Sequence, residues 1–387
     1  MTATAPPVHL HWSRSDGSPA RALWRSEAGV APPRHVQLID DTMPANVAYK
    51  LACEGTGLLW QGDFQNARHL LQALTRRLER LPGQNKASKA PASNPTQAFH
   101  QHRQQQAQRA RILGLVLLPF DADHTIPLRR APDVHQACQE AYGPPTEAYV
   151  ASLRELLGLI GAHEWRKKGV EIPALQGRIH AHYGVFSPVR GEYVDLVAKA
   201  PLPARVDRAF DIGTGTGVLA AVLARRIQGA VIATDQDPRA LACATANLHR
   251  LKLGARVNVV QADLYPEGPD KRADLIVCNP PWVPAKPSSP IEYAVYDPDS
   301  RMLRGFLAGL AAHLTPEGEG WLIMSDLAEH LGLRPREALL AWVSEAGLAV
   351  AGRLDTRPKH PKATDSSDPL HQARAAEVTS LWRLKLA

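Results

Sequence analysis

The sequence predicts an α/β protein with a mostly parallel, helix-covered sheet in its C-terminal half and an α+β accessory region in front of it. Two observations support this prediction. Short apolar runs alternate with helical patterns from residue 206 onward, and the chain closes on two strand patterns with no full helix between them. Alternation of this kind favours a parallel sheet. The two closing strands predict that the last strand runs antiparallel to the others.

The predicted strands and helices of the C-terminal half are short and regularly spaced. The strands span 206–212, 230–234, 257–261, 273–278, 320–324, 348–353 and 378–386. The helices span 217–227, 238–250, 300–314 and 334–346. We therefore expect one seven-stranded, Rossmann-like sheet in a domain that covers 171–387.

The first 170 residues form the expected accessory region, for which the sequence suggests no function. Strands are expected at 9–12, 36–39 and 112–120, and helices at 131–142 and 146–168, with a helical stretch over 45–81 in which 62–67 is a loop. A flexible linker is expected near 82–105, running into a polar helix. A nucleic-acid-binding arm is the alternative. Phe99 is the one aromatic residue there, which argues against a base-stacking platform.

Composition narrows the class of partner. Hydrophobic residues make up 44% of the chain, which is ordinary for a globular protein, and the formal net charge is +7. This charge favours an acidic partner such as RNA, DNA or the ribosome, and it is also compatible with a basic soluble enzyme. A basic loop at 357–362 could contact phosphate if it lies on the functional face.

The remaining sequence signals favour a cytoplasmic protein without a metal. The four cysteines have no metal-knuckle spacing, and we expect reduced thiols. His180 and His182 lack further ligands nearby. We see no signal-peptide pattern, and no apolar run approaches the ~20 residues that span a bilayer. The cysteines are Cys53, Cys138, Cys243 and Cys278.

A glycine-rich loop with the sequence DIGTGTG lies between a predicted strand and a predicted helix. It departs from the dinucleotide fingerprint, because Val218 stands where the third glycine is required. The carboxylate at its start would repel a pyrophosphate and suits a ligand with an ammonium group, such as S-adenosylmethionine. The candidate cofactor-binding residues are Asp211, Gly213, Thr214, Gly215 and Gly217.

Two further acids follow the next two strands. Asp235 lies about 20 residues beyond the glycine loop, where a carboxylate can accept both ribose hydroxyls. Its neighbour Asp237 is expected to cap the helix that Pro238 begins. Asp263 can accept from an adenine amino group, and a turn residue is its alternative role.

The strand over 273–278 runs into Asn279, Pro280, Pro281 and Trp282. The prolines stiffen the backbone and leave their carbonyls free to accept hydrogen bonds. An acceptor cluster beside an aromatic ring, at the carboxyl end of a strand, is typical of the functional edge of an open α/β sheet. A rigid loop without a function is the alternative.

Together, these motifs resemble a class I S-adenosylmethionine-dependent methyltransferase of the methyltransferase-small, HemK/PrmC-like group, with an Asn-Pro-Pro-Trp (NPPW) motif. The resemblance covers about 180–387. The subgroup methylates planar nitrogens. It includes release-factor and ribosomal-protein glutamine methyltransferases and enzymes that methylate adenine or guanine amino groups in DNA, rRNA and tRNA. The segment GVFSPVR at 184–190 resembles one found in the glutamine-methylating branch, although that branch usually continues with more prolines and acids and this segment continues with Gly191, Glu192 and Tyr193.

The resemblance implies roles for the residues of the NPPW motif. Asn279 and the Pro280 carbonyl would accept the N–H groups of the target nitrogen, and Trp282, where Tyr or Phe is usual, would stack on the planar group. Asn279 would also border the cofactor. The implied substrate is a protein glutamine, and a base in rRNA, tRNA or DNA is the alternative. A non-catalytic adapter that binds RNA or ribosomes is a third possibility.

Overall fold

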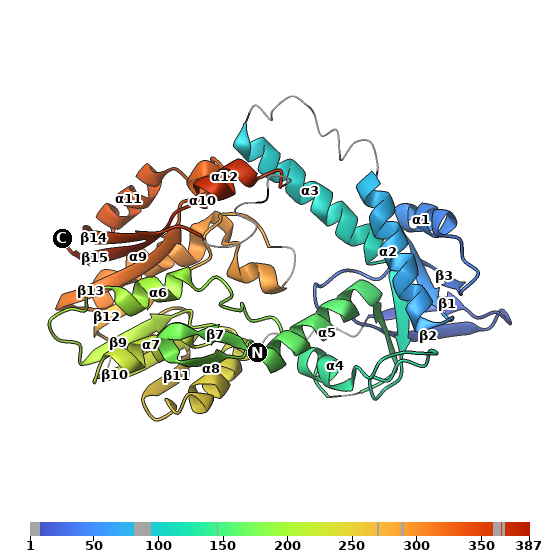
Figure 1. Cartoon of the computed structure of the whole chain (residues 1–387), viewed down its shortest axis with the longest axis horizontal. Coiled ribbons are helices and arrows are strands. Elements are labelled where there is room, and N and C mark those ends of the chain that lie inside the picture. The colour runs from blue at the N-terminus through green and yellow to red at the C-terminus, as the bar shows by residue number, and fades with distance from the viewer. Residues whose placement is uncertain are drawn as a thin grey trace. The chain divides into compact units, whose positions relative to one another are not determined.

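The structure is a computed structural model that describes residues 8–80, 94–144, 146–268, 271–287, 290–358, 365 and 368–387 (Figure 1). The chain forms two compact units. The first comprises Met1–Ser93 and His100–Glu164, and the second comprises Asn94–Phe99 and Trp165–Ala387. The division after Glu164 lies close to the domain boundary expected at residue 170.

The second unit is built on a seven-stranded sheet with the strand order β11-β10-β9-β12-β13-β15-β14. β15 runs antiparallel to both of its neighbours, and the other described neighbours pair in parallel. The predicted seven strands and antiparallel last strand are confirmed, with the last strand inserted between β13 and β14. The strands are β9 (Arg208–Ile212), β10 (Ala230–Asp235), β11 (Val257–Gln261), β12 (Ala273–Cys278), β13 (Leu314–Ser325), β14 (Leu348–Thr356) and β15 (Thr379–Leu386).

Helices cover both faces of this sheet because the apolar side chains of its strands alternate between them. Leu275 and Val277 of β12 pack with α6, α7 and α8. Ile276 and Cys278 pack with α9 and α11 on the opposite face. The helices of the unit are α6 (Glu192–Lys199), α7 (Val218–Arg226), α8 (Pro238–Arg250), α9 (Arg301–His313), α10 (Leu327–His330), α11 (Arg336–Glu345) and α12 (His371–Ala376).

Three short elements complete this unit. The hairpin of β7 (Val170–Ile172) and β8 (Gly177–Ile179), joined by η1 (Pro173–Leu175), packs its apolar residues on the α7 side of the sheet. Two 3-10 turns, η2 (Pro290–Ala294) and η3 (Pro298–Ser300), follow the NPPW motif.

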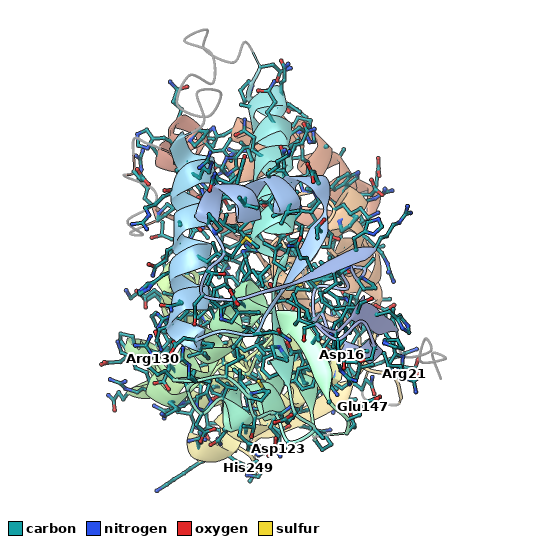
Figure 2. The ribbon with its side chains drawn as sticks, turned by 90° about the vertical axis from the view of Figure 1, so that its right-hand side faces the viewer. Asp16, Arg21, Asp123, Arg130, Glu147 and His249 are labelled. Carbon is teal, nitrogen blue, oxygen red and sulfur yellow. The ribbon has the colours of Figure 1, made fainter. Side chains whose placement is uncertain are left out.

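The first unit is an α+β fold with a six-stranded mixed sheet, in the order β1-β2-β6-β5-β4-β3. Its strands are β1 (His9–Ser13), β2 (Pro19–Trp24), β3 (His35–Ile39), β4 (Thr56–Trp60), β5 (Val116–Phe120) and β6 (Tyr149–Ser152). Its helices are α1 (Ala45–Glu54), α2 (Phe64–Arg80), α4 (His135–Tyr142), and the parts of α3 (Pro95–Leu113) and α5 (Leu153–Lys168) that fall within His100–Glu164. The start of α2 is held by an ion pair of 2.7 Å between the buried Asp63 and Arg130, which is labelled in Figure 2.

Several expectations for the first unit are wrong. The helical stretch over 45–81 is interrupted by β4, because Gly55 ends α1 at a φ of 91° and the apolar run after it pairs with β3 and β5. The loop expected at 62–67 ends early, since α2 begins at Phe64. The helix expected from residue 146 begins at Leu153, after β6. β2 was not anticipated.

The linker expected near 82–105 is wrong from Pro95 onward, where α3 runs. Phe99 belongs to the second unit, where it is buried with 3% exposure and packs with Val283, Leu331 and Leu370. Residues 82–93 of the expected linker, and residues 359–362 of the basic loop, lie outside the described residues. No helix among the described residues is both long and apolar enough to cross a membrane.

Candidate active site

The carboxyl ends of β9, β10 and β12 bring the predicted site residues to one edge of the sheet. Ile212 of β9 pairs with Thr234 of β10 on one side and with Cys278 of β12 on the other. The chain runs from β9 outward to β10 and β11 and then crosses back to β12 on the other side of β9, so the strand order reverses at β9, where open α/β sheets bind ligands. Asp235, at the end of β10, and Asn279, directly after β12, therefore lie on either side of the glycine loop.

The glycine loop needs its glycines for two physical reasons. Gly213, Gly215 and Gly217 have positive φ values of 71°, 54° and 79°, which L side chains rarely adopt. A Cβ at Gly215 would meet no described atom within 4 Å, so the backbone there is open to a ligand. A Cβ at Gly217 would lie 3.1 Å from the Cα of Ala244, so this glycine lets α8 pack closely.

Asp211 is buried, with 1% exposure, and ties the loop to α7. Its Oδ2 accepts hydrogen bonds from Thr214 Oγ1 at 2.6 Å and from the Ala220 amide at 2.9 Å. Burial raises the pKa of Asp211 to about 6, although these two hydrogen bonds act against the rise. Because both bonds end on Oδ2, Oδ1 is the oxygen left for the predicted ligand contact, which stays a prediction.

Asp235 joins the glycine loop to the start of α8. It accepts from the Gly215 amide at 3.0 Å and from the Asp237 amide at 3.0 Å. Burial raises its pKa, and the backbone hydrogen bonds oppose that rise. Asp237 caps α8 by accepting from the Arg239 amide at 2.9 Å, and Pro238 is the first helical residue, so the predicted cap is confirmed.

Asp263 lies in the loop after β11, as expected, but its side chain is 69% exposed and lies 3.4 Å from the guanidinium of Arg301. A second acid, Asp297, follows the NPPW motif. Asp297 is buried and accepts from the amides of Met302 and Leu303 at the start of α9. Burial raises the pKa of Asp297, against those hydrogen bonds. The Met302 side chain in turn lies against Gly213.

In the NPPW motif, the structure joins two side chains that the sequence treated separately. The indole Nε1–H of Trp282 donates to Asn279 Oδ1 at 2.9 Å. An indole nitrogen can only donate, so the carboxamide atom that faces it must be the oxygen. A carbonyl oxygen has two lone pairs, which leaves one of them for a substrate N–H. Pro280 is buried, and Asn279 and Trp282 are half-buried.

The stacking of Trp282 on a planar substrate group stays a prediction, and the structure shows which protein groups lie against its ring. The guanidinium carbon of Arg190 lies 5.5 Å from the ring centre, within cation–π range. The ring also packs against three apolar clusters of the unit. One face of Trp282 is therefore occupied by protein.

Sequence reasoning missed three side chains around the site. Arg190 and Glu377 pair with each other at 3.1 Å. Asn247 of α8 is buried and links the glycine loop, through the Thr216 carbonyl at 3.0 Å, to His180 after β8. A buried-looking Asn on the apolar side of a predicted helix was a signal for Asn247. Glu377 had no such local signal.

The sheet order and the polar strand ends define a class I methyltransferase fold. Residues 176–335 match the family model described as "Methyltransferase small domain". This match spans less than half of the 387-residue chain.

Relatives of known name cover only parts of the chain. It is 36% identical over 150 residues to a release factor glutamine methyltransferase of Cereibacter sphaeroides, a match that spans 38% of this chain and 50% of that protein. It is 33% identical over 147 residues to a tRNA1(Val) (adenine(37)-N6)-methyltransferase of Bacteroides fragilis, spanning 34% and 62%. The chain spans about half the length of the first of these relatives.

Among solved structures, a ribosomal protein L11 methylase from Lactobacillus delbrueckii subsp. bulgaricus is similar, with a TM-score of 0.38 and 16% identity. The similarity spans 55% of this chain and 87% of that one.

Proposed function

We propose that the protein is an S-adenosylmethionine-dependent methyltransferase that acts on a planar amide or exocyclic amine nitrogen. The observation that carries this proposal is the placement of Asn279 beside the glycine loop, on neighbouring strands that pair Cys278 with Ile212. The loop offers a cofactor surface and Asn279 offers an acceptor, at the same edge of one sheet.

The residues present fit the cofactor. The open backbone at Gly215 and the carboxylates of Asp211 and Asp235 would hold it, together with Gly213, Thr214, Gly217, Asp263 and the edge of Asn279. When bound, S-adenosylmethionine supplies a methyl group on an electrophilic sulfonium. A buried carboxylate whose pKa is raised, as for Asp211, gains most from a cationic ligand that compensates its charge.

The chain's own contribution is to position the target nitrogen. Its lone pair is delocalised into the adjoining π system, so its orientation decides reactivity. The free lone pair of Asn279 Oδ1 and the Pro280 carbonyl would each accept one N–H and aim the nitrogen at the methyl donor. The same two acceptors stabilise the positive charge that develops on nitrogen. Pro280 precedes a second proline, which restricts its backbone to extended conformations.

A protein glutamine is the substrate that we favour. The relative from Cereibacter sphaeroides is named for this activity, and the segment GVFSPVR resembles its branch. A nucleobase is the second candidate, because another relative is named as a tRNA adenine methyltransferase and the chain carries a net charge of +7. We also propose that the protein contacts RNA or the ribosome and that it is cytoplasmic.

Methyl transfer from labelled S-adenosylmethionine to a cell extract tests the function and separates the substrates. A labelled product that survives nuclease and is lost to protease supports glutamine, and the opposite pattern supports a base. Asn279→Ala should lower transfer by about a hundredfold or more while calorimetric binding of the cofactor persists. A wild-type protein that does not bind the cofactor would instead favour the non-catalytic adapter.

A further inference from the structure

Arg190 is held rigidly at the edge of the site. Its Nε donates to Glu192 Oε1 at 3.1 Å and its Nη2 donates to Glu377 Oε1 at 3.1 Å. The side chains are 22% exposed for Arg190, 7% for Glu192 and 2% for Glu377. Charge-assisted bonds between largely buried groups are stronger than surface ion pairs. Arg190 is therefore a fixed part of the site.

Glu377, which pairs with Arg190, is also bonded to a strand of the central sheet. The same Glu377 oxygen accepts from Ser325 Oγ at 2.7 Å, and Ser325 is the last residue of β13. β13 is the direct neighbour of β12, which leads into the NPPW motif. The guanidinium is thus fixed relative to the strand that carries Asn279.

Trp282 lies between Arg190 and Asn279. One ring face meets the guanidinium, with 5.5 Å between the guanidinium carbon and the ring centre, and the indole N–H meets Asn279 Oδ1 at 2.9 Å. A phenylalanine at this position would fill similar space but could not donate. The indole therefore adds an orientation to the carboxamide of Asn279 that a plain ring would leave open.

We propose that Arg190 is a positioning residue that acts through Trp282: it holds the indole so that its N–H fixes the Asn279 carboxamide, with the free lone pair of Oδ1 directed to the substrate nitrogen. This role rests on the proposed methyl transfer for its catalytic consequence. Its structural part, the contact by which Arg190 keeps the indole in place, does not depend on methyl transfer.

The rate of solvent exchange of the Trp282 indole N–H tests whether Arg190 keeps the indole in place, and it requires no measurement of enzymatic activity. The chain contains eight tryptophans, so the resonance is assigned by its loss in Trp282→Phe. In Arg190→Gln we expect the resonance to shift and its exchange to accelerate by about tenfold or more, because the ring is released. The matched control is Arg353→Gln, since Arg353 lies 5.0 Å from the ring centre of Trp382 and also pairs with an acid, Asp355, on β14. This control should leave the Trp282 resonance unchanged.

Kinetics test the consequence. Arg190→Gln and Trp282→Phe should each lower kcat by about tenfold, with the KM for S-adenosylmethionine unchanged. The double variant should be no slower than the slower single variant, because both changes interrupt one chain of contacts. Arg190→Lys keeps a positive charge beside the buried Glu377, which guards against misfolding, and should recover part of the loss.

An unchanged Trp282 resonance in Arg190→Gln and Arg190→Lys would overturn the proposal. Additive losses of kcat in the double variant would also overturn it. So would a changed Trp282 resonance in an Arg190 variant that keeps full kcat. If the wild-type protein transfers no methyl group, the proposed function fails instead, and the indole resonance still decides whether Arg190 holds Trp282.

Discussion

Replacing Asp211 with Asn should change how the stability of the protein depends on pH. The carboxyl is fully buried, and burial raises its pKa from 3.8 to about 6. Because the folded state holds the proton more tightly than the unfolded state, the folded protein loses stability as pH rises from about 4 through about 6. A change of this size corresponds to about 3 kcal/mol, since each tenfold change in acidity is worth about 1.4 kcal/mol.

About 2 kcal/mol of that loss should fall between about pH 4.5 and about pH 7.5, where urea unfolding can be measured. Asn keeps an oxygen that can accept from Thr214 and Ala220, and it has no charge to titrate. Its buried amide hydrogens add a cost, but that cost does not vary with pH. The test is therefore the pH dependence of the difference between wild type and Asp211→Asn, measured without ligand.

Glu319 provides a control of opposite sign. Burial alone would raise its pKa, but hydrogen bonds from Arg383 and Trp321 and the nearby positive charges outweigh burial and lower it. The stability that Glu319 contributes is present at neutral pH and is lost in acid, so Glu319→Gln should differ least from wild type at low pH. A difference between wild type and Asp211→Asn that does not vary with pH, or that varies as for Glu319→Gln, would refute the reasoning.

Two further predictions concern packing. Gly217→Ala should destabilise the second unit more than Gly215→Ala by about 1 kcal/mol or more, because both residues have positive φ but only Gly217 also faces Ala244 at close range. Gly215→Ala should mainly weaken cofactor binding. Equal losses of stability on urea unfolding would contradict the packing argument. Phe99→Ala should lower the free energy of unfolding by about 3 kcal/mol or more, because its ring is buried in the second unit. The matched control is Gln101→Ala, at an exposed position of α3. Similar losses for the two variants would mean that the packing of Phe99 does not stabilise the second unit.

The C-terminal half could be predicted closely because its information is local. The predicted strands at 257–261 and 273–278 and the predicted helix at 238–250 have the observed bounds. Each strand there is bounded by turn or capping residues. In the first unit β4 follows α1 after a single glycine, and its apolar residues also fit a helical pattern, so only pairing with β3 and β5 reveals a strand.

The cofactor side and the substrate side of the proposed site also differ in whether their residues can be linked by a local sequence pattern. The proposed cofactor side includes Asp211 and Asp235, which lie at the carboxyl ends of β9 and β10, so the sequence pattern alone predicts that they lie at one edge of the sheet. The proposed substrate side depends on Arg190, which precedes the sheet, and on Glu377, which lies just before its last strand. No local pattern joins residues that are so far apart in the chain. For that reason the contact between Arg190 and Trp282 became visible only in the structure.

The number of acceptors in the site predicts that a single methyl group is transferred. Trp282 occupies one lone pair of Asn279 Oδ1, so Asn279 and the Pro280 carbonyl can each take one N–H from a primary amide or amine. As the nitrogen gains a methyl group it releases one proton to solvent, so the product has one N–H, and a second round would leave an acceptor facing a methyl group. An unsatisfied buried acceptor costs about 1–3 kcal/mol, or about 5-fold to 150-fold in rate. Mass spectrometry of the labelled product should show one added methyl group, and a dimethylated nitrogen at early times would contradict this arrangement.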